Sequence, residues 1–290
     1  MCFIRYPLFI LFLALVESLL PQHPGRYSAC CLGQQREASM RVFSWGKPVI
    51  PNVIADMPTP LLISIEGNIG AGKSTLLDSL RLSNPEWIFI DEPVGVWSAF
   101  QNEAGENMLE VFYKDRKRWS YTFQNCALLT RFQNIESAIA EHFRKTGSNT
   151  EESYNYVGEG NKSSDRPVFV TERCLDTDYQ VFTKMLRAEG SIDKLEFDLY
   201  ECWFSQLKSS STQLSAIVHV DTSPEVCAER IVKRGRDGEE FIPIEYLQAL
   251  DKYQRDWVTR GEVPFVQTGT SGVEDVRGFV KSLQGGVKLI

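Results

Sequence analysis

The amino-acid sequence predicts an α/β fold, a doubly wound sheet of about five parallel strands flanked by helices. Three observations predict it. Short apolar segments typical of buried strands alternate along the chain with longer segments of helical periodicity. The first apolar segment runs through a glycine-rich turn into a helical pattern, and charged residues directly follow later apolar segments. Alternating strands and helices favour a parallel sheet, because each helix carries the chain back across it.

The strands are predicted from runs of apolar and β-branched residues, and the helices from apolar positions that recur at helical spacing. The predicted strands are 61–65, 87–90, 167–171, 215–220 and 264–268. The first predicted helix starts at Lys73, and a later one starts near Pro224. The other predicted helices span 106–116, 119–143, 176–189, 192–209 and 243–259, and a terminal helix follows the fifth strand. Pro93 ends the second strand, and Pro224 near a helix start suits that position. These elements make up one domain over residues 60–290.

Residues 1–59 are set apart from this domain as a leader or disordered extension. The apolar run at 7–16 is shorter than the ~20 residues that span a bilayer and has the length of a signal-peptide core. Three interpretations stay open: a leader that targets an organelle such as the mitochondrion, a disordered extension of a cytosolic protein, or an upstream start that is not used, since Met40 and Met57 follow. No stable membrane span is expected.

Composition disfavours some partners and compartments. The net charge of −7 argues against a nucleic-acid polymer as partner, because phosphate backbones require basic surfaces. The seven cysteines form no C-x-x-C pair, so we expect free thiols in a reducing, intracellular compartment. The stretch 147–166 is rich in glycine, serine and asparagine and is predicted to be a mobile surface loop.

The strongest motif is a glycine-rich loop between the first strand and the first helix. Gly67, Gly72, Lys73 and Ser74 fit the pattern G-x-x-x-x-G-K-[ST]. Inward-pointing N–H groups and the positive helix N-terminus bind phosphate there, Lys73 reaches the outer phosphates, and Ser74 ligates Mg²⁺. A tight turn with glycine for shape alone is the simpler alternative, which the strand–loop–helix context disfavours. The expected nucleotide contacts are Gly67, Asn68, Ile69, Gly70, Ala71, Gly72, Lys73, Ser74 and Thr75.

Three carboxylates at strand ends are candidates for the chemistry. Glu92 follows the second strand, at the edge where parallel sheets bind ligands, and is the first candidate for a general base. A solvated carboxylate explains Glu92 equally well from spacing alone. Asp221 and Glu172 each follow a later strand as a candidate metal ligand, and spacing does not separate them.

A basic cluster follows the fourth strand. Arg230, Lys233, Arg234 and Arg236 stand close together in a segment, about 230–240, that we predict to be a lid over the donor phosphates. The simpler alternative is that these cations stabilise the C-terminus of a helix, which explains part of the cluster.

Several specific stretches occur in a fixed order within residues 60–268. They are EGNIGAGKST at 66–75, DEPV and a tryptophan at 91–97, FY and WSYTFQ within 112–124, TER at 171–173, and RGR, IP and EYL within 234–247. Together they resemble the deoxyribonucleoside kinase family, in its deoxycytidine and deoxyguanosine kinase-like branch. The resemblance implies a P-loop kinase fold that transfers the γ-phosphate of ATP, or another nucleoside triphosphate, to the 5′-hydroxyl of a deoxynucleoside in salvage. It also implies Mg²⁺ as cofactor and a homodimer.

The resemblance implies roles that spacing leaves open. Glu92 is the implied general base, Arg173 lies beside the reacting hydroxyl with Lys73 at the donor phosphates, and Glu172 is associated with the metal. Arg230, Arg234 and Arg236 are the implied lid arginines. The implied acceptor contacts are Tyr113 and Glu239 to the sugar 3′-hydroxyl, Gln124 to the base edge, and Trp97 and Phe123 around the base.

Arg131 and Asp178 match positions that the cytosine- and purine-accepting branch of the family fills with the same residues. Such a pair offers donors and acceptors to an exocyclic amino group, which thymine lacks, so we expect deoxycytidine and purine deoxynucleosides to be preferred over thymidine. A purely structural ion pair is the alternative.

Two other functions compete with a deoxynucleoside kinase. A nucleoside monophosphate kinase would need an additional basic site for the acceptor phosphate, and the Tyr113–Glu239 sugar contacts disfavour it. A non-catalytic relative that serves as a subunit of an organellar complex would have lost catalytic positions, but Lys73, Glu92 and Glu172 are present.

Overall fold

The computed structural model describes residues 59–147, 166–236 and 238–285. The predicted leader, except its last residue, and nearly all of the predicted mobile loop lie outside the described residues, so both stay predictions. Within the described ranges, no helix is both long and apolar enough to cross a membrane.

Five parallel strands form one sheet, which confirms the predicted fold class. The strands are β1 (Leu61–Glu66), β2 (Ile88–Ile90), β3 (Val168–Glu172), β4 (Leu214–Val220) and β5 (Phe265–Thr268). Their order across the sheet is β2-β3-β1-β4-β5, and every pairing is parallel. The carboxyl ends of β1, β2 and β3 therefore lie at the same edge, where parallel sheets bind ligands.

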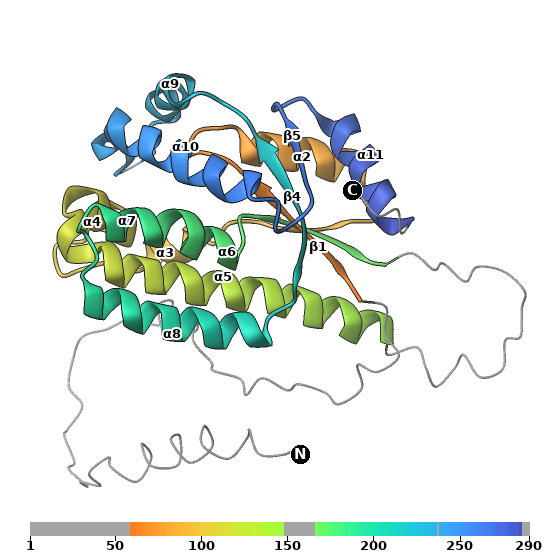
Figure 1. Cartoon of the computed structure of the whole chain (residues 1–290), viewed down its shortest axis with the longest axis horizontal. Coiled ribbons are helices and arrows are strands. Elements are labelled where there is room, and N and C mark those ends of the chain that lie inside the picture. The colour runs from red at the N-terminus through yellow and green to blue at the C-terminus, as the bar shows by residue number, and fades with distance from the viewer. Residues whose placement is uncertain (1–58, 148–165, 237, 286–290) are drawn as a thin grey trace, which may run out of the picture. The chain divides into compact units, whose positions relative to one another are not determined.

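Both faces of the sheet are covered by helices, so all six residues of β1 are buried. Successive side chains of a strand point to opposite faces. Leu61 and Ile63 pack with α2 (Lys73–Ser83), α9 (Pro224–Arg234) and α11 (Val273–Gln284). Leu62 packs with the long helix α5 (Arg116–Gly147) on the other face. Figure 1 shows α2 and α11 on one side of the strands and α5 on the other.

Local sequence signals fix several helix starts. Asn107 and Glu110 form a capping box that begins α4 (Met108–Lys114), and Asp193 and Glu196 do the same for α8 (Lys194–Ser210). Ser223 caps α9, whose first residue is proline. Helix α10 (Ile244–Thr259) follows a short 3₁₀ turn, η4 (Glu239–Phe241).

The structure differs from the predicted elements in two places near the site. A short helix, α3 (Val94–Ala99), follows Pro93, where six residues with a glycine give no detectable periodicity. The predicted helix over 176–189 is divided into α6 (Leu175–Thr177), a π-helical turn η3 (Asp178–Thr183) and α7 (Lys184–Ala188). A π-helical turn has no distinct sequence signal, and such turns often occur at functional sites.

Candidate active site

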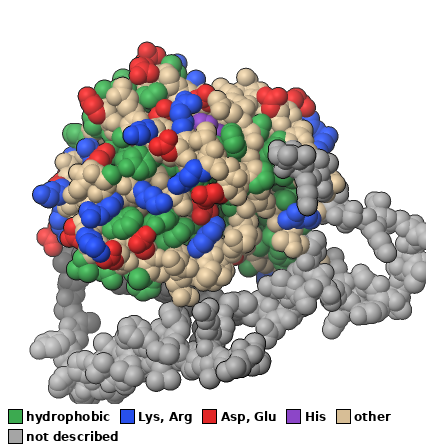
Figure 2. Space-filling model, in the orientation of Figure 1, with side chains coloured by type: hydrophobic (Ala, Val, Ile, Leu, Met, Phe, Trp, Pro, Cys, Tyr) green, Lys and Arg blue, Asp and Glu red, His purple; other side chains and the backbone are tan. Residues whose placement is uncertain are grey.

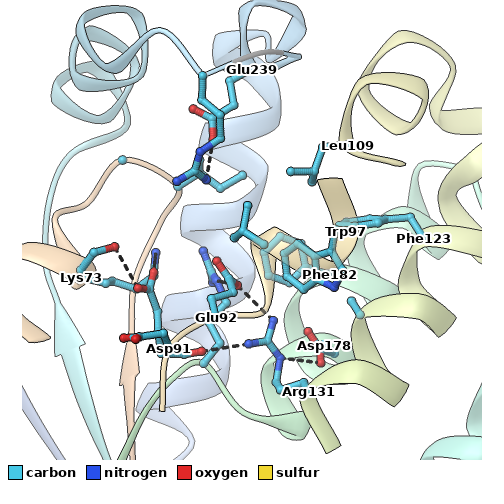
Figure 3. A pocket seen from close by; sticks show the side chains of 18 of the residues that line it. Lys73, Asp91, Glu92, Trp97, Leu109, Phe123, Arg131, Asp178, Phe182 and Glu239 are labelled. Atoms are coloured by element: carbon cyan, nitrogen blue, oxygen red, sulfur yellow. Dashed lines mark hydrogen bonds and ion pairs between the residues drawn. The ribbon is translucent and has the colours of Figure 1, made fainter. Parts of the chain in front are cut away.

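A cavity of about 280 Å³ opens at the carboxyl ends of β1, β2 and β3. Figure 3 shows Lys73 on one side of it, the rings of Trp97, Phe123 and Phe182 on the other, and Glu92 between them. The lining residues are Ile69, Gly70, Lys73, Ser74, Asp91, Glu92, Val94, Trp97, Leu109, Tyr113, Phe123, Gln124, Ala127, Arg131, Glu172, Arg173, Asp178, Phe182, Arg234, Arg236 and Glu239. The cavity thus has a charged half and an aromatic half.

The glycine-rich loop needs glycine for its backbone shape and for space. Gly72 has φ 97, and a Cβ there would lie 2.3 Å from the Thr270 side chain. The loop is tied to α10, because the Asn68 side chain donates to the Leu247 carbonyl at 2.8 Å. Any larger residue at position 72 would clash with Thr270, so glycine is required there. The hydrogen bond to α10 holds the loop next to the cavity.

Lys73 begins α2 and is buried, with Nζ 2.9 Å from the Asn68 carbonyl. Burial and the neighbouring Arg173 lower the pKa of Lys73 to about 8. The ammonium is thus poorly solvated and has few protein partners, which suits a group that receives phosphate oxygens.

Ser74 and Glu172 meet across the sheet edge. The Ser74 hydroxyl donates to Glu172 Oε2 at 2.9 Å, and Lys73 Nζ lies 3.6 Å from Glu172 Oε1. Asp221, the other candidate metal ligand, instead accepts from Arg255 and Gln267 at 2.5 Å each and does not line the cavity. A hydroxyl beside a carboxylate is a fitting partial ligand set for Mg²⁺, which usually takes its other ligands from water and substrate phosphates.

Arg131 connects the carboxylates of the cavity. Its guanidinium, almost fully buried, donates to Asp178 at 2.9 Å, to Glu92 at 3.0 Å and to the Glu172 carbonyl at 2.9 Å. Burial acts to raise the pKa of Glu92, but the charges of Arg131 and Arg173 outweigh it, so this pKa lies below its ordinary value. Burial raises the pKa of Asp178 to about 6. Glu92 is therefore the stronger acid of the two.

Arg173 has a backbone conformation that positions its side chain. Its φ of 66 is the only left-handed value of a non-glycine residue among those described. The guanidinium lies 3.3 Å from Glu92 Oε1 and stacks over the Phe182 ring, 4.8 Å from its centroid. Strain of this kind persists where surrounding contacts fix it and is common at functional sites.

Aromatic rings line the other half of the cavity. Trp97 and Phe123 meet edge to face at 5.4 Å, and the Trp97 ring nitrogen donates to Thr130. Gln124 is buried at 1 % exposure, and its side-chain oxygen has no hydrogen-bond partner in the described structure. An unpaired buried acceptor is costly, so this oxygen suits a ligand that brings a donor.

The predicted lid arginines divide into two groups. Arg234 pairs with Glu239 through a bond of 2.7 Å, and Arg236 lies 3.2 Å from the same carboxylate. Arg230 instead donates to the Ala71 carbonyl of the glycine-rich loop at 2.8 Å and does not line the cavity.

Tyr113 also lines the cavity, near Glu239. Burial and the charge of Glu239 raise the pKa of the Tyr113 phenol, so this group stays neutral.

The structure brings together the predicted residues of both halves and adds others. Five residues that were not predicted from the sequence also line the cavity: Asp91, Val94, Leu109, Ala127 and Phe182. Of these, Asp91 and Val94 belong to the DEPV stretch at 91–94 and were open to prediction. Phe182 could not be placed, because a π-helical turn carries it into the cavity. The predicted nucleotide contacts outside the lining set are Gly67, Asn68, Ala71, Gly72, Thr75 and Arg230.

A glycine-rich loop before a helix at this edge of a parallel sheet, with cations and carboxylates around one cavity, defines a P-loop phosphotransferase. The family model described as deoxynucleoside kinase matches residues 63–281. The chain belongs to the deoxynucleoside kinase family and is a nucleoside kinase that uses a nucleotide phosphate donor.

Similar proteins agree with this family. Deoxycytidine kinase 2 of Gallus gallus is 33% identical over 211 residues, which cover 68% of this chain and 73% of that protein. Deoxycytidine kinase of Homo sapiens is 31% identical and covers 68% and 74%. The mitochondrial deoxyguanosine kinase of Xenopus laevis is 29% identical and covers 68% and 73%.

We predict that Arg131→Met lowers the free energy of unfolding by ~3–5 kcal/mol at alkaline pH, because it leaves the buried Asp178 carboxylate without its cation. Asp178 has a folded pKa of about 6 in the unchanged enzyme, and loss of Arg131 raises this pKa further. The penalty is therefore absent below the pKa of the unchanged enzyme, grows as pH rises above it, and is complete above the higher folded pKa of the variant. Urea unfolding at several pH values measures it.

The matched control is Arg131→Met combined with Asp178→Asn, which removes both charges at similar volume. This pair of changes should recover most of the lost stability, as replacement of whole buried ion pairs often does. Equal unfolding free energies for the single and double variants would contradict the electrostatic explanation.

Proposed function

We propose that this enzyme transfers the γ-phosphate of ATP, or another nucleoside triphosphate, to the 5′-hydroxyl of a deoxynucleoside. Deoxycytidine and purine deoxynucleosides are preferred over thymidine, and the reaction serves nucleotide salvage. The observation that carries the proposal is the Arg131 guanidinium, which contacts Glu92 and Asp178 together at the junction of the two halves of the cavity.

The aromatic half suits a nucleobase. Trp97, Phe123 and Phe182 provide apolar surfaces around a planar ring, and Gln124 offers an unpaired oxygen to a donor on the base edge. The ionised Asp178 accepts a hydrogen bond from an exocyclic amino group. Thymine places a carbonyl oxygen at the corresponding position, and two facing acceptors repel each other. Selection against thymidine follows from this mismatch.

The charged half suits the reacting groups. Glu92, kept ionised by its two arginine partners, accepts the proton of the 5′-hydroxyl, and Arg173 stabilises the negative charge that develops there. Lys73, Arg234 and Arg236 supply positive charge to the donor phosphates. Ser74 and Glu172 would hold Mg²⁺, which supplies charge neutralisation when bound.

The alternatives fit the cavity less well. A nucleoside monophosphate kinase would bring an acceptor phosphate towards Glu92 and Glu239, two carboxylates that repel it. A non-catalytic relative does not need Lys73, Glu92 and Arg173 to surround one cavity, yet they do. The compartment stays a prediction, because residues 1–58 lie outside the described residues and one similar protein is named mitochondrial while others are not.

The first test is a phosphorylation assay with ATP and each of the four deoxynucleosides. We expect kcat/KM to be lowest for thymidine. The combined Arg131→Met and Asp178→Asn variant should lower the deoxycytidine-to-thymidine ratio by at least about tenfold, since it removes hydrogen-bond discrimination worth ~1–3 kcal/mol. Thymidine as the best substrate of the unchanged enzyme would refute the proposed specificity.

The second test concerns the general base. Glu92→Gln should lower kcat at least about a hundredfold and leave nucleoside binding nearly unchanged, because the amide keeps the shape but cannot take a proton. Asp221→Asn is the matched control, because this carboxylate follows β4 at the same edge of the sheet but does not line the cavity, and the variant should retain turnover within about threefold. Near-normal turnover of the Glu92 variant would remove its proposed role.

The third test concerns the proposed homodimer. Helix α8 exposes Leu195, Leu199 and Trp203 at helical spacing, at 69, 46 and 51 %. Apolar side chains lie among charged ones on the face viewed in Figure 2. Trp203→Glu should shift sedimentation velocity towards the monomer, whereas Leu82→Glu on α2 should not. A monomer for the unchanged chain would reject this proposal.

A further inference from the structure

A buried carboxylate lies behind the cavity rather than in it. Glu66, the last residue of β1, has no exposed surface and does not line the cavity. Within the described part of the chain, its carboxylate forms no ion pair. Its donors are instead neutral: the Ser64 hydroxyl at 2.5 Å, the Thr177 hydroxyl, and the Gln254 amide at 3.3 Å. A buried carboxylate that makes no ion pair depends on its hydrogen-bond donors, so these donors need an explanation.

The donors come from different elements. Ser64 belongs to β1 itself, Thr177 to α6 and Gln254 to α10. Both hydroxyls donate to Oε1, and the amide donates to Oε2. A carboxyl group offers two oxygens to these donors, whereas a side-chain amide accepts at one oxygen only.

Thr177 lies where this network meets the site. Its hydroxyl donates to Glu66 and accepts from the Cys174 backbone N–H at 3.2 Å, which closes the turn after Arg173. The next residue along the chain is Asp178. Thr177 therefore directly precedes Asp178 and is hydrogen-bonded to Cys174, the residue after Arg173.

The left-handed turn at Arg173 is held from its other side as well. The Arg173 N–H donates to the Ile65 carbonyl at 3.1 Å, and the Thr171 hydroxyl donates to the Arg173 carbonyl at 3.0 Å. Ile65 and Glu66, at the end of β1, thus contact this turn through both backbone and side chain. The same two residues lead directly into the glycine-rich loop.

We propose that Glu66 is a positioning residue that acts through Thr177. It holds the segment from Arg173 to Asp178 so that Arg173 meets Glu92 and Asp178 meets Arg131. Because β1 also carries the glycine-rich loop, this network sets the acceptor site relative to the donor site. The inference rests on the proposed function and adds to it a buried group that touches no substrate.

The experiment compares substitutions at the two hydroxyls that share Glu66 Oε1. Thr177→Val removes, at nearly constant volume, the hydroxyl on the segment from Arg173 to Asp178. Ser64→Ala removes the hydroxyl on β1, which lies outside that segment. Thr177→Ser keeps a hydroxyl. For each variant, kcat and KM are measured with deoxycytidine and with thymidine, together with thermal unfolding.

We expect Thr177→Val to lower kcat for deoxycytidine at least about tenfold and the deoxycytidine-to-thymidine ratio of kcat/KM about fivefold, because small misplacements of reacting groups are costly. Ser64→Ala and Thr177→Ser should stay within about threefold in both readouts. Loss of stability alone would not change the substrate ratio.

Equal effects of Ser64→Ala and Thr177→Val, or an unchanged substrate ratio in Thr177→Val, would overturn the inference. If Thr177→Val does not fold, Thr177→Ala takes its place. Crystal structures of these variants add a readout that needs no activity: Arg173 should leave its left-handed conformation only when the Thr177 hydroxyl is lost. An unchanged enzyme that phosphorylates no deoxynucleoside would refute the proposed function, and the conformation of Arg173 would then decide the positioning role alone.

Discussion

The site depends on one buried cation. Arg131, on the long helix α5, donates to Asp178, to Glu92 and to the Glu172 carbonyl, so its guanidinium joins three segments of chain. Two carboxylates this close to each other in a buried cavity cannot both be ionised without such a partner. The planar guanidinium also fixes the direction of each bond, which an ammonium would not do. The positions of Glu92 and Asp178 thus depend on this side chain, and Arg173 adds a second positive charge beside Glu92.

The strand order explains why these groups converge. Central strand β1 has β3 on one side and β4 on the other, and the loop after β1 leads to α2 on one face. The segment after β3 leads to η3 and α7 on the opposite face. Such a switch point leaves a crevice between neighbouring strand ends. The crevice holds Lys73 and Ser74 from one side and Arg173 and Asp178 from the other.

The sequence predicted the parts of this site that local patterns determine. Buried parallel strands appear as apolar runs, and the spacing of Gly67, Gly72 and Lys73 appears directly because a phosphate loop is continuous in the chain. Spacing alone did not separate Glu172 from Asp221, because each stands at the end of a predicted strand. The resemblance favoured Glu172, and in the folded chain Asp221 accepts hydrogen bonds from Arg255 and Gln267 instead of lining the cavity.

Features that depend on tertiary contacts were not open to prediction. The turn of η3 and the position of Phe182 result from packing against α5, α8 and α10, and no local pattern encodes them. Cys202 is exposed whereas Cys174 is buried, although both stand among apolar residues in the sequence. Similarly, four basic residues close in sequence gave one predicted lid, yet Arg230 and Arg234 contact different partners.

The charges that line the cavity give a physical reason for the proposed metal. The lining cations are Lys73, Arg131, Arg173, Arg234 and Arg236, and the lining anions are Asp91, Glu92, Glu172, Asp178 and Glu239. They are equal in number, and most are already paired with one another. A triphosphate adds several negative charges to a cavity that has no free excess of positive charge. A divalent cation held by Ser74 and Glu172 would supply the missing positive charge, and Arg131 and Arg173 could keep the partners that orient Glu92 and Asp178. The balance of protein charges therefore favours a metal-assisted transfer over one driven by the arginines alone.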